Sequence, residues 1–194
     1  MRSLVLSVFV AASPVHAAEL QALIVTGATD KAAAEKLLEG VKKKAETVAE
    51  VLTFAAGFPR LEESAAVKGL KPGFFIVVAG YCGDDALLPA VKALDGGAYA
   101  KPVQVEAAGC PALADGWSVL GAEVKDKDKR VLRGTLFRPK GDEGSWLLYL
   151  SLRDKAGAVV SERAVKEEEV SGCMYGGTAE LAARAGALAV TTED

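Results

Sequence analysis

Few side chains in this chain of 194 residues could perform catalysis. The single histidine is His16, and the cysteines are Cys82, Cys110 and Cys173. His16 lies in an N-terminal segment that we expect to be removed, which leaves the mature chain without an imidazole. Ser-His-Asp and Cys-His catalysis in their usual forms, and zinc sites that need histidine, are therefore excluded for the mature chain.

Two carboxylate pairs and one thiol are the remaining groups with catalytic potential. The pairs are Glu62–Glu63 and Asp84–Asp85, and the thiol is Cys173 in the sequence SGCMYGG. A glycosidase needs two carboxyl groups about 5–10 Å apart, and adjacent residues rarely converge in this way. Cys173 has no histidine to activate it and follows three glutamates that raise its pKa. We expect no enzyme activity and keep a cysteine- or carboxylate-dependent enzyme as the alternative.

The first 17 residues have the pattern of a secretory signal peptide. Arg2 precedes an apolar run from Leu4 to Ala12, and Val15-His16-Ala17 fits a small-x-small cleavage site. The run is far shorter than the roughly 20 residues of a spanning helix. We therefore predict cleavage after Ala17, with no membrane span in the mature chain and a periplasmic or secreted location.

Cleavage makes the formal charge more negative, from −3 to −4, because the removed segment carries Arg2 and no acidic residue. Nucleic acids and anionic lipids select basic surfaces. The charge therefore argues against both as partners. About half of the residues are apolar, and the mature length suits one domain or two small ones.

The three cysteines can be oxidised in an exported protein. Because the number is odd, at most one internal disulfide forms and one thiol remains. Their spacing matches no metal motif, and no glycine-rich loop has nucleotide-binding spacing. We therefore expect no metal and no cofactor. Three unpaired thiols are the alternative to a disulfide.

The first part of the chain predicts a strand, a helix and a second strand. Residues Leu20 to Thr26 are apolar, Gly27 ends the run, and Thr29 or Asp30 can cap a helix. The helical spacing is carried by Ala33, Leu37, Leu38 and Val41. The second strand is expected over Thr47 to Phe54, followed by a long connecting loop.

The same order recurs further along the chain. The run FFIVVA at positions 74–79 predicts a strand buried on both faces. Asp84 or Asp85 can cap the helix that follows, with Pro89 in its first turn. The apolar positions of that helix are Leu87, Leu88, Val91 and Leu94, and a last strand is expected near Val103 to Glu106.

Two strand–helix–strand units in tandem predict an α+β fold of the ferredoxin-like β-α-β-β-α-β type for residues 18–108. In that fold the turn after the third strand and the end of the fourth strand can lie close together. Cys82 follows the third strand and Cys110 follows the fourth. We therefore predict a Cys82–Cys110 disulfide.

Residues 113–194 predict an antiparallel β module in the form of a meander. Short apolar runs are separated by the turn sequences KDKDK, PKGDEG and DKAG. The expected strands are 117–124, 131–138, 145–153 and 158–165. An exposed acidic loop is expected over 166–177. The sequence of residues 178–190 favours a C-terminal helix, and a final strand is the alternative.

The first half resembles the SPOR (sporulation-related repeat) domain over about Leu20 to Glu106. The matching segments are IVTGATDKAAAEKLL at the first strand–helix junction and FFIVVAGY in the third strand. Members of that family bind peptidoglycan glycan strands on the helix-free face of the sheet. The resemblance therefore implies a cell-wall binding protein.

These observations favour an exported, non-catalytic binding or scaffolding protein. Its partner is expected to be peptidoglycan or another exported protein. The alternatives are a protein–protein interaction module without glycan binding, and a small-molecule module with a pocket between the halves. The candidate contact residues are Tyr81, Trp117, Trp146 and Tyr175. Core packing is the alternative role for both tryptophans.

Overall fold

The computed structural model describes residues 18–106, 108–140, 146–166, 178–184 and 187–193. The expected signal peptide, Cys173, Tyr175 and most of the expected acidic loop lie outside these residues. The described chain is a mixed α and β structure in which every paired strand is antiparallel. Within those ranges, no helix is both long and apolar enough to cross a bilayer.

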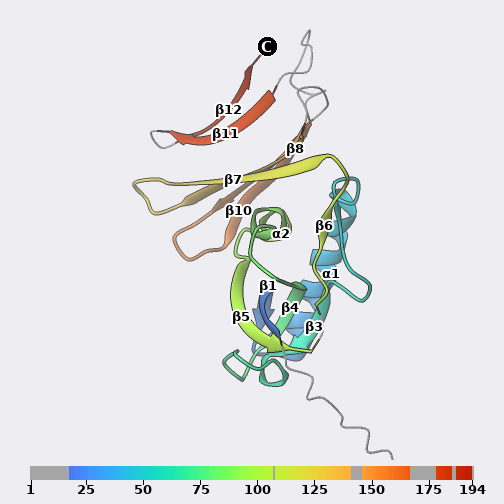
Figure 1. Ribbon diagram of the computed structural model, residues 1–194. Helices are drawn as coiled ribbons and strands as arrows, with labels where there is room; N and C mark the ends of the chain where they lie inside the picture. The colour runs from blue at the N-terminus through green and yellow to red at the C-terminus, as the bar shows by residue number, and fades with distance from the viewer. Residues whose placement is uncertain (1–17, 107, 141–145, 167–177, 185–186, 194) are drawn as a thin grey trace, which may run out of the picture.

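The elements follow one another along the chain as Figure 1 shows. The first half contains β1 (Ala18–Ala28), α1 (Lys31–Thr47), β2 (Leu52–Thr53), β3 (Arg60–Glu63), the 3-10 turn η1 (Ser64–Ala66), β4 (Phe75–Cys82), α2 (Leu88–Leu94) and β5 (Tyr99–Val105). The second half contains β6 (Ala112–Leu113), β7 (Trp117–Lys125), β8 (Val131–Pro139), β9 (Leu147–Arg153), β10 (Val159–Lys166), β11 (Thr178–Arg184) and β12 (Ala187–Glu193).

The N-terminal sheet has the strand order β3-β4-β1-β5. Its strand β4 is buried along almost its whole length, as the apolar run predicts. Val77 lies in the cluster on the face of the sheet that α1 and α2 cover, and Val78 lies in the cluster on the opposite, helix-free face. The connecting segment 55–74 covers much of this helix-free face through Phe58, Val67 and Leu70.

Helix α1 begins where the sequence predicts, because the Asp30 carboxylate accepts a hydrogen bond from the Ala33 backbone N–H at 2.8 Å. The expected strand over Thr47 to Phe54 is wrong. Lysine, alanine and glutamate favour helix and extend α1 to Thr47. Only Leu52–Thr53 is extended, and it pairs with β6 instead of the N-terminal sheet.

The second half contains the expected meander, with strand order β10-β9-β8-β7. The expected C-terminal helix over 178–190 is wrong, because β11 and β12 form a hairpin there. The hairpin packs against β7 and β8. Leu181 and Leu188 pack against Gly134, where an added Cβ atom would lie 3.1 Å from Leu181 Cδ2 and 3.0 Å from Leu188 Cδ1. The partial burial of these leucines overrides the helix preference of the alanines in this segment.

One hydrophobic core joins the two halves of the chain. Helix α2 lies between the two four-stranded sheets (Figure 1). Leu23 of β1 and Leu94 of α2 belong to the same buried cluster as Phe137 of β8 and Leu147 of β9. The expected segments 18–108 and 113–194 therefore share their interior.

The predicted disulfide between Cys82 and Cys110 is present, with the two Cα atoms 4.8 Å apart. The neighbouring residues Tyr81 and Gly109 exchange both backbone hydrogen bonds, each 3.1 Å long. The segment before β6 is thereby held against the end of β4, on the edge of β4 that pairs with β3 as far as Val78.

Candidate functional site

Tyr81, a predicted contact residue, is a buried part of the helix-free face and is 2% exposed. Its hydroxyl donates to Glu62 Oε2 at 2.8 Å, and Glu62 Oε1 accepts from Arg60 Nε at 2.7 Å. The Phe58 ring packs edge-on against the Tyr81 ring at 5.8 Å, and the Arg60 guanidinium lies 4.4 Å from the Phe58 centroid. Burial and the Glu62 hydrogen bond raise the pKa of Tyr81. This cluster joins β3 to β4 and keeps the Tyr81 ring buried.

The two tryptophans lie in the second half and do not form a shared site with Tyr81. Trp146 is buried with Leu136 and Leu148 on the face that the β11–β12 hairpin covers. Its indole Nε1 has no hydrogen-bond partner among the described residues. Trp117 is half-buried and packs against the shared core. These positions give both rings a packing role, and Tyr175 lies outside the described residues.

A cavity of about 580 Å³ lies at one end of the N-terminal sheet. We call it the Tyr99 cavity. It is bounded by Ile24 on β1, Ile76 on β4, Leu70 in the connecting segment and Tyr99 on β5. Its volume is within the range of about 300–1,000 Å³ that is usual for ligand pockets.

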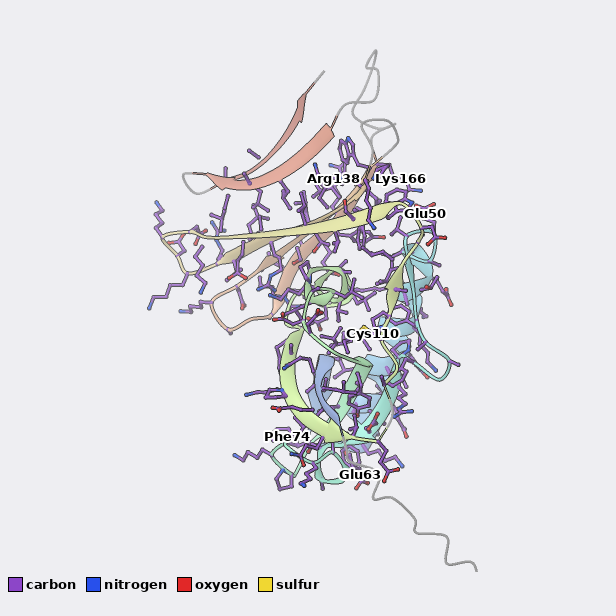
Figure 2. The ribbon with its side chains drawn as sticks, viewed as in Figure 1. Glu50, Glu63, Phe74, Cys110, Arg138 and Lys166 are labelled. Carbon is purple, nitrogen blue, oxygen red and sulfur yellow. A yellow bond between two sulfur atoms is a disulfide. The ribbon has the colours of Figure 1, made fainter. Side chains whose placement is uncertain are left out.

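Two aromatic rings at the Tyr99 cavity are exposed to solvent, Phe74 by 41% and Tyr99 by 44%. Tyr99 is opposite Ile24 in the β5–β1 ladder, so both side chains lie on the helix-free face. The backbone N–H of Phe74 donates to Ser64 Oγ at 3.1 Å, and its carbonyl accepts from the Ser64 N–H at 2.9 Å. Figure 2 shows Phe74 at the end of the molecule far from the β11–β12 hairpin.

The charged groups of the Tyr99 cavity are mostly positive. Arg153 donates one hydrogen bond to Asp95 and a second to the Gly157 carbonyl at 2.7 Å. Lys71 and Lys101 also line the cavity. Within the part of the chain that the structure describes, neither lysine makes an ion pair or a side-chain hydrogen bond. Two ammonium groups are thus available to an acidic ligand.

This arrangement can bind a ligand that has both apolar faces and carboxylates. Exposed aromatic rings pack against apolar surfaces such as the faces of sugar rings, and unpaired lysines attract carboxylates. No group of three or more His, Cys, Asp or Glu side chains in the described ranges is arranged to hold a metal ion. The cavity therefore fits binding chemistry by aromatic and cationic side chains.

Sequence reasoning missed the residues of the Tyr99 cavity. Phe74 was expected inside a buried strand, whereas β4 begins at Phe75. Tyr99 and Lys101 lie two residues apart in β5, which places both on one face of the sheet. The alternation of side chains along this strand was the signal from which Tyr99 and Lys101 could have been placed on one face. The contributions of Lys71 and Arg153 depend on tertiary packing and have no local signal.

Comparisons of the chain with family models, with curated proteins and with solved structures find no match. The functional argument therefore rests on the geometry of the chain itself.

Proposed function

We propose that this chain is an exported, non-catalytic binding protein that holds an acidic cell-wall glycan in the Tyr99 cavity. The observation that carries the proposal is the pairing of exposed rings with unpaired cations in one cavity. Phe74 and Tyr99 supply the rings, and Lys71 and Lys101 supply the charges. Peptidoglycan fits this chemistry because it combines sugar rings with carboxylate groups.

The sheet order supports a ferredoxin-like, SPOR-like fold for the first half. When β1, β3, β4 and β5 are taken as the four strands of a β-α-β-β-α-β unit, the order is second, third, first, fourth. Each neighbouring pair is antiparallel. Helices α1 and α2 contribute Val41, Val91 and Leu94 to a single face. Ile24, Ile76 and Tyr99 of the Tyr99 cavity lie on the other face, where the resemblance implies glycan binding.

The connecting segment limits how much of this face a glycan could reach. Phe58, Val67 and Leu70 already cover the middle of the sheet. The Tyr99 cavity remains at the end of the sheet, beside the turn that contains Gly69 and Lys71. We therefore propose that a short stretch of glycan binds there, instead of a long strand that lies across the whole sheet.

The disulfide supports an oxidising location outside the cytoplasm. Cys82 and Cys110 are bonded, and stable disulfides are rare in the reducing cytosol. The N-terminal pattern of residues 1–17 gives an independent argument for export from the sequence. A wall ligand and an exported chain would thus share a compartment.

Sedimentation with insoluble peptidoglycan tests the proposal. The mature chain is expected to co-sediment saturably, and Tyr99→Ala and Lys101→Gln are each expected to weaken binding about tenfold, the loss of one good contact. Leu37→Ala is the matched control for Tyr99, because Leu37 is 38% exposed on α1 and does not line the cavity. Lys127→Gln in the β7–β8 turn is the control for Lys101.

Two results would contradict wall binding: no saturable sedimentation of the wild-type chain, or equal losses in the cavity variants and their controls. The sedimentation assay should include folded-state checks by circular dichroism, since both cavity substitutions replace partly exposed residues.

A protein–protein interaction module is the second candidate function. Strand β10 pairs only with β9 in the described sheet and so forms an edge. Its Val159 and Val160 are 48% and 56% exposed, and an exposed apolar edge strand favours pairing with another chain. Val160→Lys should abolish partner binding if this candidate is correct, and should leave peptidoglycan sedimentation unchanged.

A further inference from the structure

A second cavity lies where α1 and α2 approach the β8–β10 part of the second sheet. It has a volume of about 160 Å³, and we call it the Lys92 pocket. The side chains that matter are Lys44 of α1, Lys92 of α2, Arg133 of β8, Ser151 of β9 and Glu162 of β10. The Lys92 pocket and the Tyr99 cavity share no lining residue.

Strand register arranges the polar side chains of the pocket in one row. Glu123 is opposite Arg133, Arg133 is opposite Ser151, and Ser151 is opposite Glu162. Residues in register point to the same face of a sheet, and this is the face on which α2 packs through Thr135, whose hydroxyl donates to the Pro89 carbonyl at 3.0 Å. The row therefore lies beneath α2.

Both carboxylates of the row already have cationic partners. Arg133 donates through Nε and Nη2 to Glu123 Oε2. Lys44 Nζ donates to Glu162 Oε2 at 2.6 Å. Arg163 of β10 also lines the pocket. Four cationic side chains, Lys44, Lys92, Arg133 and Arg163, are thus set against the carboxylates of Glu123 and Glu162, so positive charge is in excess.

Lys92 is an unpaired cation of the pocket. Its ammonium makes no ion pair and no hydrogen bond with any residue that the structure describes. Burial and the nearby Arg133 charge lower the pKa of Lys92, and Glu123 and Asp85 oppose this only in part. A site that disfavours the charged form of a lysine is one where a bound anion would be stabilised.

Three donors converge beside Gly96. The position that a Cβ atom on Gly96 would occupy lies 2.8 Å from Ser151 Oγ, 2.9 Å from Arg153 Nε and 3.0 Å from Arg133 Nη1. None of these three atoms has a hydrogen-bond partner in the described part of the chain. Glycine at position 96 keeps the donors clear of a neighbouring side chain.

We propose that the Lys92 pocket binds the carboxylate group of a small acid, with Lys92, Ser151 Oγ and Arg133 Nη1 as its donors. A carboxylate can accept hydrogen bonds from these donors and offsets part of the excess positive charge. The pocket is smaller than the usual ligand pocket of about 300 Å³ or more, so it holds one acidic group or a small acid. This site is independent of the proposed function.

Nuclear magnetic resonance of the Lys92 side chain tests the site, with sodium acetate as the probe and sodium chloride added to keep ionic strength constant. We expect a saturable shift of the Lys92 ε-methylene signal. Ser151→Ala should weaken acetate binding about threefold or more, the loss of one neutral hydrogen bond. Lys92→Gln, followed by the Ser151 backbone amide signal, should weaken it about tenfold or more.

Lys92→Arg and Lys43→Gln are the matched variants. Arginine keeps the charge and should retain acetate binding within about threefold of wild type, the cost of an imperfect replacement. Lys43 is exposed on α1 and is not a pocket residue, so its loss should have no effect. The proposal is overturned if the acetate shift is linear and non-saturable, if Lys92→Gln binds like wild type, or if inorganic phosphate binds more tightly than acetate.

Discussion

Arg153 of β9 donates a hydrogen bond to Asp95, the C-cap residue of α2. The contact joins a strand of the second sheet to the turn that leads into β5. Arg153 also donates to the Gly157 carbonyl at 2.7 Å, so one guanidinium holds the β9–β10 turn and the α2–β5 turn together. Arg153 and Asp95 both line the Tyr99 cavity. The position of the candidate site therefore depends on the packing of the two halves.

Replacing this guanidinium should destabilise the whole chain. Arg153→Gln leaves the Asp95 carboxylate without its cationic partner in a site where only 23% of that side chain is exposed. We expect a loss of about 1–3 kcal/mol in the free energy of unfolding, measured by urea denaturation. Lys155→Gln, in the exposed β9–β10 turn, is the control. Equal stability of the two variants would show that the pair contributes nothing.

The shared core leads to a second prediction, on the stability of a variant at Phe137. Phe137 is fully buried, belongs to the same cluster as Leu23 and Val77, and packs edge-on against Tyr149 at 6.3 Å. Phe137→Ala should cost about 3–5 kcal/mol through a cavity that the surrounding side chains cannot fill. Phe74→Ala, at an exposed ring, should cost less than about 1 kcal/mol.

Unfolding of the wild-type chain should also be cooperative across both halves. Trp117 and Trp146 report on the second half by fluorescence, and amide exchange in β1 reports on the first. Coincident transitions are expected because both halves bury side chains in one cluster. Two separate transitions would mean that the shared core does not couple them.

The disulfide should contribute substantially to stability. Cys82 and Cys110 are 28 positions apart, and closing a loop of this length restricts the unfolded chain by about 3–4 kcal/mol in the chain-entropy model. The double variant Cys82→Ala/Cys110→Ala should lose about that much in urea denaturation, and reductant should no longer affect it. A thiol titration of the unfolded, unreduced wild type should give one thiol per chain, from Cys173. Three thiols would contradict the bond.

Stability should fall in alkaline solution because of Tyr81. Burial, with the hydrogen bond to Glu62, raises its pKa in the folded state above the ordinary value of 10.0. Below pH 10 both states keep the phenol proton and its contribution is complete. Above that pH the unfolded state loses the proton first, so the free energy of unfolding decreases as the pH rises.

Tyr81→Phe separates this effect from other titrations. The variant lacks the phenol, so its urea midpoint should fall less than that of wild type between pH 9 and pH 11. It should also be less stable at pH 7 by about 1 kcal/mol, since the Glu62 hydrogen bond is lost. Identical alkaline slopes would rule out Tyr81 as the source.

Local sequence patterns predicted the elements whose burial is strong and continuous. The run that forms β4 is apolar on both faces, and Asp30 has the chemistry of a helix cap, so both were recognisable. The Cys82–Cys110 bond followed from an expected order of strands. These features depend on neighbours in sequence or on one simple topology.

Tertiary packing decided the elements that the sequence did not predict. The segment 178–190 is rich in alanine and leucine, which suits a helix, but it forms a hairpin whose half-buried leucines pack against Gly134. The long connecting segment supplies β3 and covers the helix-free face, although its local pattern reads as a loop. Phe74 and Tyr99 are distant in the sequence and line the same cavity only in the folded chain, so the cavity had no continuous signal.

The most direct test of glycan binding is a titration of the isotopically labelled mature chain with soluble peptidoglycan fragments, followed residue by residue by nuclear magnetic resonance. Saturable shifts are predicted at Tyr99, Phe74, Lys101 and Ile24, and they should disappear in Tyr99→Ala. Shifts confined to β10, or no saturable shifts at any residue, would contradict the proposal that the Tyr99 cavity binds the wall.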